Sequence, residues 1–308
     1  MSRRVCWLVL LVLAAVLAGC SSNGAETKGS PRSGGGPRIV SPSASPGSSR
    51  FQRYVALGDS YSAGPLIPTT NLAGGCARSD HNYPSLVAKR LGVRTFVDVT
   101  CSGASTTDLT RVQRTFGDAR IPPQALQLNR KTDLVTIGIG GNDLDLFDTL
   151  IRMCTRLGRT DPTGSPCTHE LAVRGVDLAA VTRTITAKVA AALREVRRRA
   201  PRATVLLVGY LRLVPSNGTC PALPLAAGDY AVGRRIGEAL SRAQRRAART
   251  TGVRFIDMYA ASRGHDICSR DPWVNGRVTD RQRALAYHPF ESGMKADAAH
   301  VLKALKTN

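Results

Sequence analysis

The stretch Tyr54-Val55-Ala56-Leu57-Gly58-Asp59-Ser60-Tyr61-Ser62 decides how this chain folds. Its first four residues form a short apolar run, which is typical of a buried β-strand. The run passes directly through Gly58 and Asp59 to a serine, so we expect a tight turn there and a helix after it. The sequence therefore places the hydroxyl of Ser60 at the carboxyl end of a strand.

Four further apolar runs and four amphipathic segments follow this first strand along the chain. The predicted strands are residues 54–57, 95–99, 134–139, 204–208 and 253–256. The predicted helices are residues 85–91, 176–199, 230–249 and 291–305, in which apolar residues recur every three or four positions. Strands that alternate with helices pair in parallel, with helices on both faces of the sheet. The sequence therefore predicts an α/β fold.

Polar and glycine-rich blocks stand at the ends of the predicted strands, where parallel sheets gather their chemistry. Cys101-Ser102-Gly103-Ala104 follows the second strand, and Gly140-Gly141-Asn142-Asp143 follows the third. Tyr287-His288-Pro289 precedes the last helix. A serine hydroxyl needs a nearby base, and the oxyanion formed when it attacks an acyl carbon needs hydrogen-bond donors. These blocks could supply both.

Each of these residues also has a structural interpretation. Ser60 could be a helix cap, and Asn142 and Gly103 could simply form turns. Their combination with His288 favours catalysis. The other four histidines, which have no motif around them, are His81, His169, His265 and His300. Trp273 could line a cleft or fill the core.

Four blocks, in their order along the chain, resemble those of the SGNH or GDSL hydrolase family, and the resemblance covers residues 53–305. The blocks are Gly-Asp-Ser, the later glycine block, Gly-Gly-Asn-Asp and the late His-Pro. The resemblance implies a flavodoxin-like, three-layer α/β/α sandwich with a five-stranded parallel sheet. It also implies a serine esterase or lipase that needs no metal or organic cofactor. Ser60 would be the nucleophile and His288 the general base, and the N–H groups of Ser60 and Gly103 with the amide of Asn142 would form the oxyanion hole.

One position departs from the commoner family pattern, which has an acidic residue three positions before the histidine. Here that position is Leu285. The resemblance to actinobacterial members implies that the main-chain carbonyl of Leu285 orients His288 instead, while Asp280 is a weaker substitute. Asp59 and Asp143 are expected to support neighbouring turns and loops.

The N-terminus has the features of an export signal. Residues 1–20 combine Arg3 and Arg4 with an apolar run too short to span a bilayer comfortably. Leu17-Ala18-Gly19-Cys20 resembles the lipobox of bacterial lipoproteins, which implies a lipidated Cys20 and anchoring to the outer face of the cell membrane. Ordinary signal cleavage and secretion is the alternative. Residues 21–50 are rich in Ser, Gly and Pro, which predicts a disordered linker before a catalytic domain at 51–308.

Export also determines what the cysteines mean. Six remain in the catalytic domain, an even number in an oxidising compartment, and this predicts three disulfides with fifteen possible connectivities. No two have CxxC spacing, which argues against a zinc site. The resemblance to secreted actinobacterial esterases implies pairing in sequence order: Cys76–Cys101, Cys154–Cys167 and Cys220–Cys268.

The chain has 43 basic and 22 acidic residues, for a net charge of +21. Such a surface attracts anionic lipid headgroups or wall polymers, or is a solvated arginine-rich surface. Nucleic acid is a poor partner for an exported chain that has no aromatic binding motif. We expect a monomer acting on lipid esters or acylated surface glycans. Acyl transfer at the same site and a non-catalytic binding lipoprotein are the alternatives.

Overall fold

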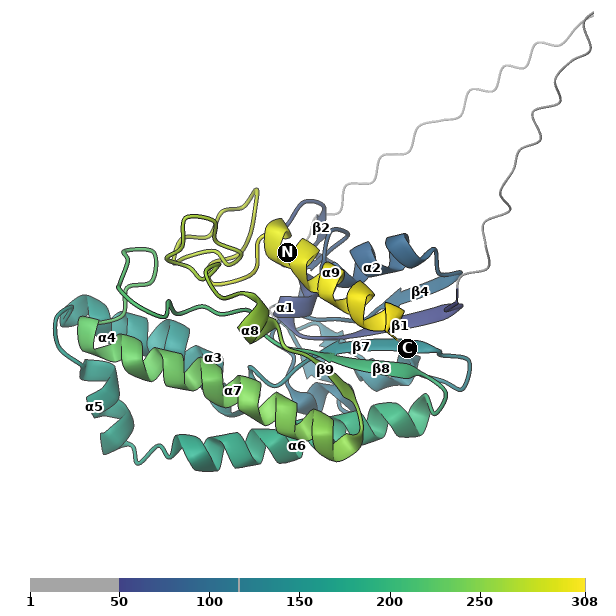
Figure 1. Cartoon of the computed structure of the whole chain (residues 1–308), viewed down its shortest axis with the longest axis horizontal. Helices are drawn as coiled ribbons and strands as arrows, with labels where there is room; N and C mark the ends of the chain where they lie inside the picture. The colour runs from purple at the N-terminus through teal and green to yellow at the C-terminus, as the bar shows by residue number, and fades with distance from the viewer. Residues whose placement is uncertain (1–49, 116, 308) are drawn as a thin grey trace, which may run out of the picture. The chain divides into compact units, whose positions relative to one another are not determined.

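The computed structural model describes residues 50–115 and 117–307 (Figure 1). The predicted signal peptide, the lipidation of Cys20 and nearly all of the predicted linker lie outside these residues. The description below therefore concerns the predicted catalytic domain alone.

Five parallel strands form the central sheet, in the order β4-β1-β7-β8-β9. In chain order of these five strands this is 2-1-3-4-5, the flavodoxin-like order predicted from the resemblance. Each strand begins within one residue of the predicted start. The strands are β1 (Arg53–Gly58), β4 (Thr95–Asp98), β7 (Leu134–Gly138), β8 (Thr204–Val208) and β9 (Arg254–Ile256).

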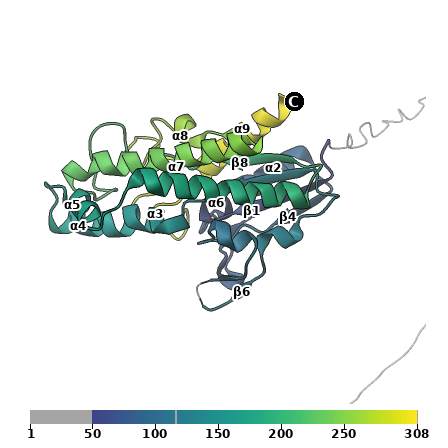
Figure 2. The ribbon, with the colours of Figure 1, turned by 90° about the horizontal axis from the view of Figure 1, so that it is seen from below.

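Helices cover both faces of the sheet, as Figures 1 and 2 show. On one face α2 (Tyr83–Leu91) packs against α9 (Glu291–Lys306), and on the other α6 (Leu178–Arg199) packs against α7 (Tyr230–Thr251). Helix α6 buries Ile185, Val189, Leu193 and Val196, residues three or four positions apart that form one apolar stripe. The three-layer α/β/α sandwich is therefore confirmed.

A run of short helices between β7 and α6 was not predicted. It comprises α3 (Leu146–Asp148), the π-helical η5 (Thr149–Cys154), α4 (Thr155–Thr160) and α5 (Pro166–Val173). Helices of three to eight residues are too short for apolar periodicity to stand out in a sequence. Tertiary packing stabilises them, since Leu150, Cys154 and Cys167 are completely or almost completely buried.

Small elements complete the described part of the chain. They are α1 (Ser60–Ala63), α8 (Met258–Ala261), the 3₁₀ turns η1 (Ala73–Gly75), η2 (Thr106–Leu109), η3 (Gln124–Gln127), η4 (Asp143–Asp145) and η6 (Ala227–Asp229), and two antiparallel ladders, β2 (Thr70–Asn71) with β3 (Arg78–Ser79) and β5 (Gln113–Arg114) with β6 (Arg120–Ile121). None of the helices in the described range is long and apolar enough to cross a membrane.

Three disulfides join segments that are 13 to 48 residues apart in the sequence. They are Cys76–Cys101, Cys154–Cys167 and Cys220–Cys268, the pairing that the resemblance implied. The first bridge fixes the segment just before Gly103, and the second joins η5 to α5.

Candidate active site

Ser60 lies on the turn between β1 and α1, at the carboxyl end of β1. Gly58 has φ +145°, and a Cβ atom on it would lie 2.6 Å from the carbonyl oxygen of Gly138, so only glycine fits this close approach. Asp59 caps α1 by accepting a hydrogen bond of 2.9 Å from the backbone N–H of Tyr61. Ser60 is the first residue of the helix and is 8% exposed.

His288 approaches Ser60 from the other end of the chain. Its Nε2 lies 2.8 Å from the hydroxyl oxygen of Ser60, and its Nδ1 lies 2.7 Å from the carbonyl oxygen of Ala286. A carbonyl oxygen only accepts hydrogen bonds, so Nδ1 carries the proton in the neutral ring. The lone pair of Nε2 then faces the serine hydroxyl, as a general base requires.

The prediction that the Leu285 carbonyl orients this ring is wrong by one residue. That carbonyl accepts the backbone N–H of His288 at 3.1 Å and the side-chain amide of Asn275 at 3.3 Å. Tyr287 has φ +62°, a left-handed conformation that turns the chain so that the ring folds back over the carbonyl of Ala286.

No carboxylate among the described residues forms a hydrogen bond or ion pair with the His288 ring. Asp280, the nearest upstream acid, instead caps its own turn by accepting from the backbone N–H of Gln282 at 2.9 Å. Burial lowers the pKa of His288 to about 4, although the hydrogen bond to Ala286 acts in the opposite direction. The imidazole is therefore neutral at physiological pH.

Gly103 and Asn142 lie beside this pair. Gly103 has φ +79°, and the side-chain amide of Asn142 donates to the carbonyl of Ala104 at 2.8 Å, which leaves its second N–H available. Within residues 50–115 and 117–307, the backbone N–H groups of Ser60 and Gly103 donate to no other group. Ser60, Gly103, Asn142 and His288 line one pocket of about 220 Å³, which we call the Ser60 pocket. The structure thus brings the four residues predicted from the motifs together.

The turn of Ser60 is tied to the loop of Asn142 by a buried residue that sequence reasoning missed. The hydroxyl of Tyr210 donates a short hydrogen bond to Asp59 and accepts the backbone N–H of Gly141 at 2.8 Å. Burial raises the pKa of Asp59 to about 7, although hydrogen bonds from Tyr210 and Tyr61 oppose the rise. Tyr210 follows β8 by two residues, at the same edge of the sheet. Its position just after a predicted strand is the feature of the sequence that could have identified it.

Asp143 supports the same edge of the sheet from the neighbouring loop. It accepts hydrogen bonds from the backbone N–H of Thr106 at 3.1 Å and from its hydroxyl at 2.7 Å, and Lys188 lies 3.5 Å away. These contacts join the loop after β7 to η2, which follows the loop of Gly103. The expected supporting roles of Asp59 and Asp143 agree with these contacts.

Asn275 holds the loop that carries His288, and sequence reasoning missed it too. Its side-chain amide donates to the carbonyls of Val278 and Ala284 at 2.9 and 3.0 Å, and its backbone N–H donates to the carbonyl of His288 at 2.9 Å. Nearby Trp273 stacks on His265 at 3.9 Å and is not among the residues that line the Ser60 pocket. The Asn275-Gly276 pair signalled only a turn.

Aromatic and aliphatic side chains form much of the rest of the Ser60 pocket, which Asp148 and Arg152 also line. Tyr61 stacks on Phe147 at a centroid distance of 5.3 Å, and Tyr210 meets both rings edge-on at about 5 Å. Ile151, Leu213 and other apolar side chains also line the pocket. Its walls therefore suit an apolar group next to the serine hydroxyl.

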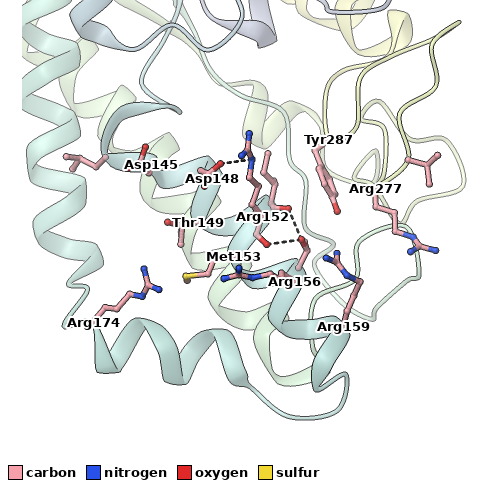
Figure 3. Close-up of a pocket in the computed structure, with 14 residues that line it drawn as sticks. Asp145, Asp148, Thr149, Arg152, Met153, Arg156, Arg159, Arg174, Arg277 and Tyr287 are labelled. Carbon is pink, nitrogen blue, oxygen red and sulfur yellow. Dashed lines mark hydrogen bonds and ion pairs between the residues drawn. The ribbon is translucent and has the colours of Figure 1, made fainter. Parts of the chain in front are cut away.

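A second, larger pocket adjoins the first. It has a volume of about 910 Å³, and its residues come mainly from the run of short helices after β7 (Figure 3). Asp148, Ile151, Arg152 and Tyr287 line both pockets. We call it the arginine pocket after Arg152, Arg156, Arg159, Arg174 and Arg277. Among the described residues, no group of three or more His, Cys, Asp or Glu side chains could hold a metal ion.

Comparison with known proteins agrees with the class of enzyme that this fold and site suggest. The GDSL-like lipase/acylhydrolase family matches residues 56–296, from β1 into α9. The chain therefore belongs to this family, as its motifs predicted, and it is a carboxylic ester hydrolase of the SGNH type.

Individual relatives extend this result. The chain is 38% identical to Lipase 2 of Streptomyces coelicolor over 266 residues, which cover 82% of this chain and 85% of the relative. Among solved structures, the extracellular lipase of Streptomyces rimosus has a TM-score of 0.67 at 29% identity, over 82% of this chain and 99% of the other. Phospholipase A1 of Streptomyces albidoflavus has a TM-score of 0.65 at 28% identity, with the same coverage.

Proposed function

We propose that the chain hydrolyses its esters through an acyl-enzyme on Ser60, with His288 as the general base. The observation that carries this proposal is the contact of 2.8 Å between the serine hydroxyl and an imidazole whose other nitrogen is held by the carbonyl of Ala286. Two features support it: the low pKa of His288 and the adjacent N–H groups without acceptors.

The reaction follows from this geometry in two steps. The oxygen of Ser60 attacks the acyl carbon while its proton passes to Nε2 of His288, and the N–H groups of Ser60, Gly103 and Asn142 donate to the oxyanion. Nε2 then protonates the leaving alcohol. Water, deprotonated by the same nitrogen, releases the acid from the serine. The Ala286 carbonyl fixes the ring, although it stabilises the imidazolium less than a carboxylate would.

Lipid esters are the substrate class that we propose. The apolar walls of the Ser60 pocket suit an acyl chain, and three of the similar proteins are named lipase or phospholipase A1. Acylated surface glycans, the other class expected from the sequence, have less apolar surface to place against Phe147, Ile151 and Leu213.

We also propose the domain organisation that the sequence suggests. Residues 1–20 would be a lipoprotein signal, Cys20 would carry the lipid, residues 21–50 would be the linker, and residues 51–308 would be the hydrolase. The chain would then act on the outer face of the cell membrane. Changing Cys20→Ala should abolish incorporation of labelled palmitate and shift the protein from the membrane to the medium. Retention of label in the variant would contradict the lipid anchor.

Active-site labelling tests the mechanism. A fluorophosphonate probe should label the wild-type protein, and Ser60→Ala should remove all label. His288→Ala should lower kcat/KM for a neutral chromogenic ester by about 10⁴-fold or more, because the hydroxyl loses its base. Asp280→Asn is the matched control near the same loop and should stay within about twofold.

Other outcomes of these experiments identify the alternatives. A wild-type protein that never labels would be a binding lipoprotein, and labelling that survives in Ser60→Ala would place the nucleophile elsewhere. Transfer of the acyl group to an added alcohol in preference to water would indicate an acyltransferase. A loss of about a thousandfold in Asp280→Asn would show that a carboxylate orients the histidine.

A further inference from the structure

The arginine pocket, with a volume of about 910 Å³, is a cavity that the proposed chemistry does not use. Figure 3 shows its arginines on the helices that follow β7 and on the loop before His288. Two carboxylates, those of Asp145 and Asp148, also line it, against five guanidinium groups. The pocket therefore has a surplus of positive charge directly beside the serine.

Most of this charge is not neutralised in the free protein. Arg152 pairs with Asp148 at 2.8 Å, but the two side chains are 72% and 53% exposed, and Arg174 pairs with Glu170 at 2.6 Å. Such exposed pairs are weak and exchange readily with a competing anion. Arg156, Arg159 and Arg277 have no carboxylate partner among the described residues.

Three of the arginines lie in a continuous helical segment, and all three line the arginine pocket. Arg152 is in η5, and Arg156 and Arg159 follow in α4 at intervals of four and three residues. Residues with this spacing lie on the same side of a helix, and like charges there destabilise it. The segment also contains a π-helical turn, a feature often found at functional sites. A bound anion would remove the repulsion between these guanidinium groups.

Tyr287 connects this charge to the catalytic pair. Its ring lines both pockets, its neighbour is His288, and its carbonyl accepts the hydroxyl of Tyr61 at 2.7 Å. Burial raises the pKa of the Tyr287 phenol, while the nearby charges of Arg159 and Arg277 lower it. A substrate that occupied both pockets would therefore pass Tyr287.

We propose that Arg156, Arg159 and Arg277 form a subsite for the phosphate group of an acylglycerol phosphodiester. This inference rests on the proposed function, because the acyl ester of the same molecule would lie at Ser60. Guanidinium groups bind phosphate oxygens through paired N–H donors, and these three arginines line one pocket. The apolar walls of the Ser60 pocket take the acyl chain, and the volume of about 910 Å³ next to them takes the charged headgroup.

Selectivity between two matched substrates tests this subsite in the full-length protein. Dihexanoyl phosphatidylglycerol carries the phosphate, and dihexanoylglycerol is the same diacyl ester without it. The double variant Arg156→Gln/Arg159→Gln should lower the ratio of their kcat/KM values about tenfold or more. The control Arg246→Gln/Arg249→Gln removes the same charge from exposed positions on α7 and should leave the ratio unchanged. An unchanged ratio in the first variant would overturn the proposal.

A binding measurement separates this inference from the proposed catalytic mechanism. In the Ser60→Ala background, titration calorimetry with monomeric dihexanoyl phosphatidylglycerol should show binding that Arg156→Gln/Arg159→Gln weakens about tenfold. Equal affinities of the Ser60→Ala protein with and without the two arginine substitutions would reject the subsite even if Ser60 proves to be the nucleophile. Conversely, binding that depends on these arginines in a protein that hydrolyses no ester would reject the catalytic proposal and leave the subsite standing.

Discussion

The Ser60 pocket and the arginine pocket share four residues but differ in how their polar groups are held. In the Ser60 pocket His288 is fixed by a hydrogen bond to a carbonyl, and behind the pocket Asp59 and Tyr210 are fixed by hydrogen bonds to buried neighbours. In the arginine pocket, the cations are exposed, and their ion pairs join neighbouring turns of the same helix. Bond making requires preorganised groups, whereas recognition of a headgroup can use charges that remain solvated until the substrate arrives.

The energies involved differ accordingly. A buried donor or acceptor that loses its partner costs about 1–3 kcal/mol, whereas an exposed ion pair contributes only about 0–1 kcal/mol. Substitutions in the Ser60 pocket should therefore affect both rate and stability. Substitutions in the arginine pocket should affect selectivity and leave stability nearly unchanged.

The largest contrast is expected at the oxyanion donors. Asn142→Ala removes the proposed side-chain donor to the oxyanion and should lower kcat for a neutral ester by about 10²–10³-fold, with little change in KM. The surface variant Arg246→Gln is the control for general effects of substitution. A loss of less than about tenfold in Asn142→Ala would mean that the N–H groups of Ser60 and Gly103 suffice.

A pH profile sharpens the contrast, because it reports on the protonation of His288 in the Ser60 pocket. With a pKa of about 4, the imidazole is the free base at pH 5, so kcat/KM for a neutral ester should keep most of its plateau value there. An imidazole with the ordinary pKa of about 6.5 would leave only about 3% of the plateau. Activity should fall about tenfold per pH unit below 4. An acidic limb near pH 6.5 would show that the ring is solvated in the free enzyme.

Tyr210→Phe tests whether the buried network stabilises the fold as well as the site. The change removes the hydroxyl and leaves the N–H of Gly141 without its acceptor, so the free energy of unfolding should fall by about 1–3 kcal/mol. Urea unfolding with the disulfides intact measures this effect. Arg156→Gln, in the exposed pocket, should change the same quantity by no more than about 0.5 kcal/mol. Equal effects of the two substitutions would contradict the contrast.

Ionic strength should act on the exposed pocket alone, and this is the smallest effect. Between about 0.1 and 1 M salt the Debye length falls from about 10 Å to about 3 Å. For monomeric dihexanoyl phosphatidylglycerol, kcat/KM should fall by roughly fivefold, because the arginines are screened. For dihexanoylglycerol it should change less than about twofold. Equal salt dependence would mean that the arginines do not contact the phosphate.

The elements that the sequence predicted well are those with long or uniform patterns. The mainly apolar strand at 134–139 and the long amphipathic helix at 176–199 were predicted within two residues of their observed bounds. Burial in a parallel sheet and the 3.6-residue period of a helix both leave a pattern in the local sequence. The short helices at 146–173 were not predicted, and neither was the arginine pocket. In the sequence, Arg152, Arg156 and Arg159 cannot be distinguished from ordinary surface charges until the arrangement of these short helices is known.

The sequence by itself determined the class of fold, the order of the strand-end blocks and the pairing of a serine with a late histidine, because each depends on residue type at the end of a strand or the start of a helix. Only the tertiary structure decided which carbonyl holds His288, how Tyr210 joins two loops, and that arginines surround an opening beside the serine. Those features depend on a left-handed residue at Tyr287 and on contacts between segments up to 151 residues apart. Local sequence patterns do not encode such contacts, because they form only when the whole sheet is assembled.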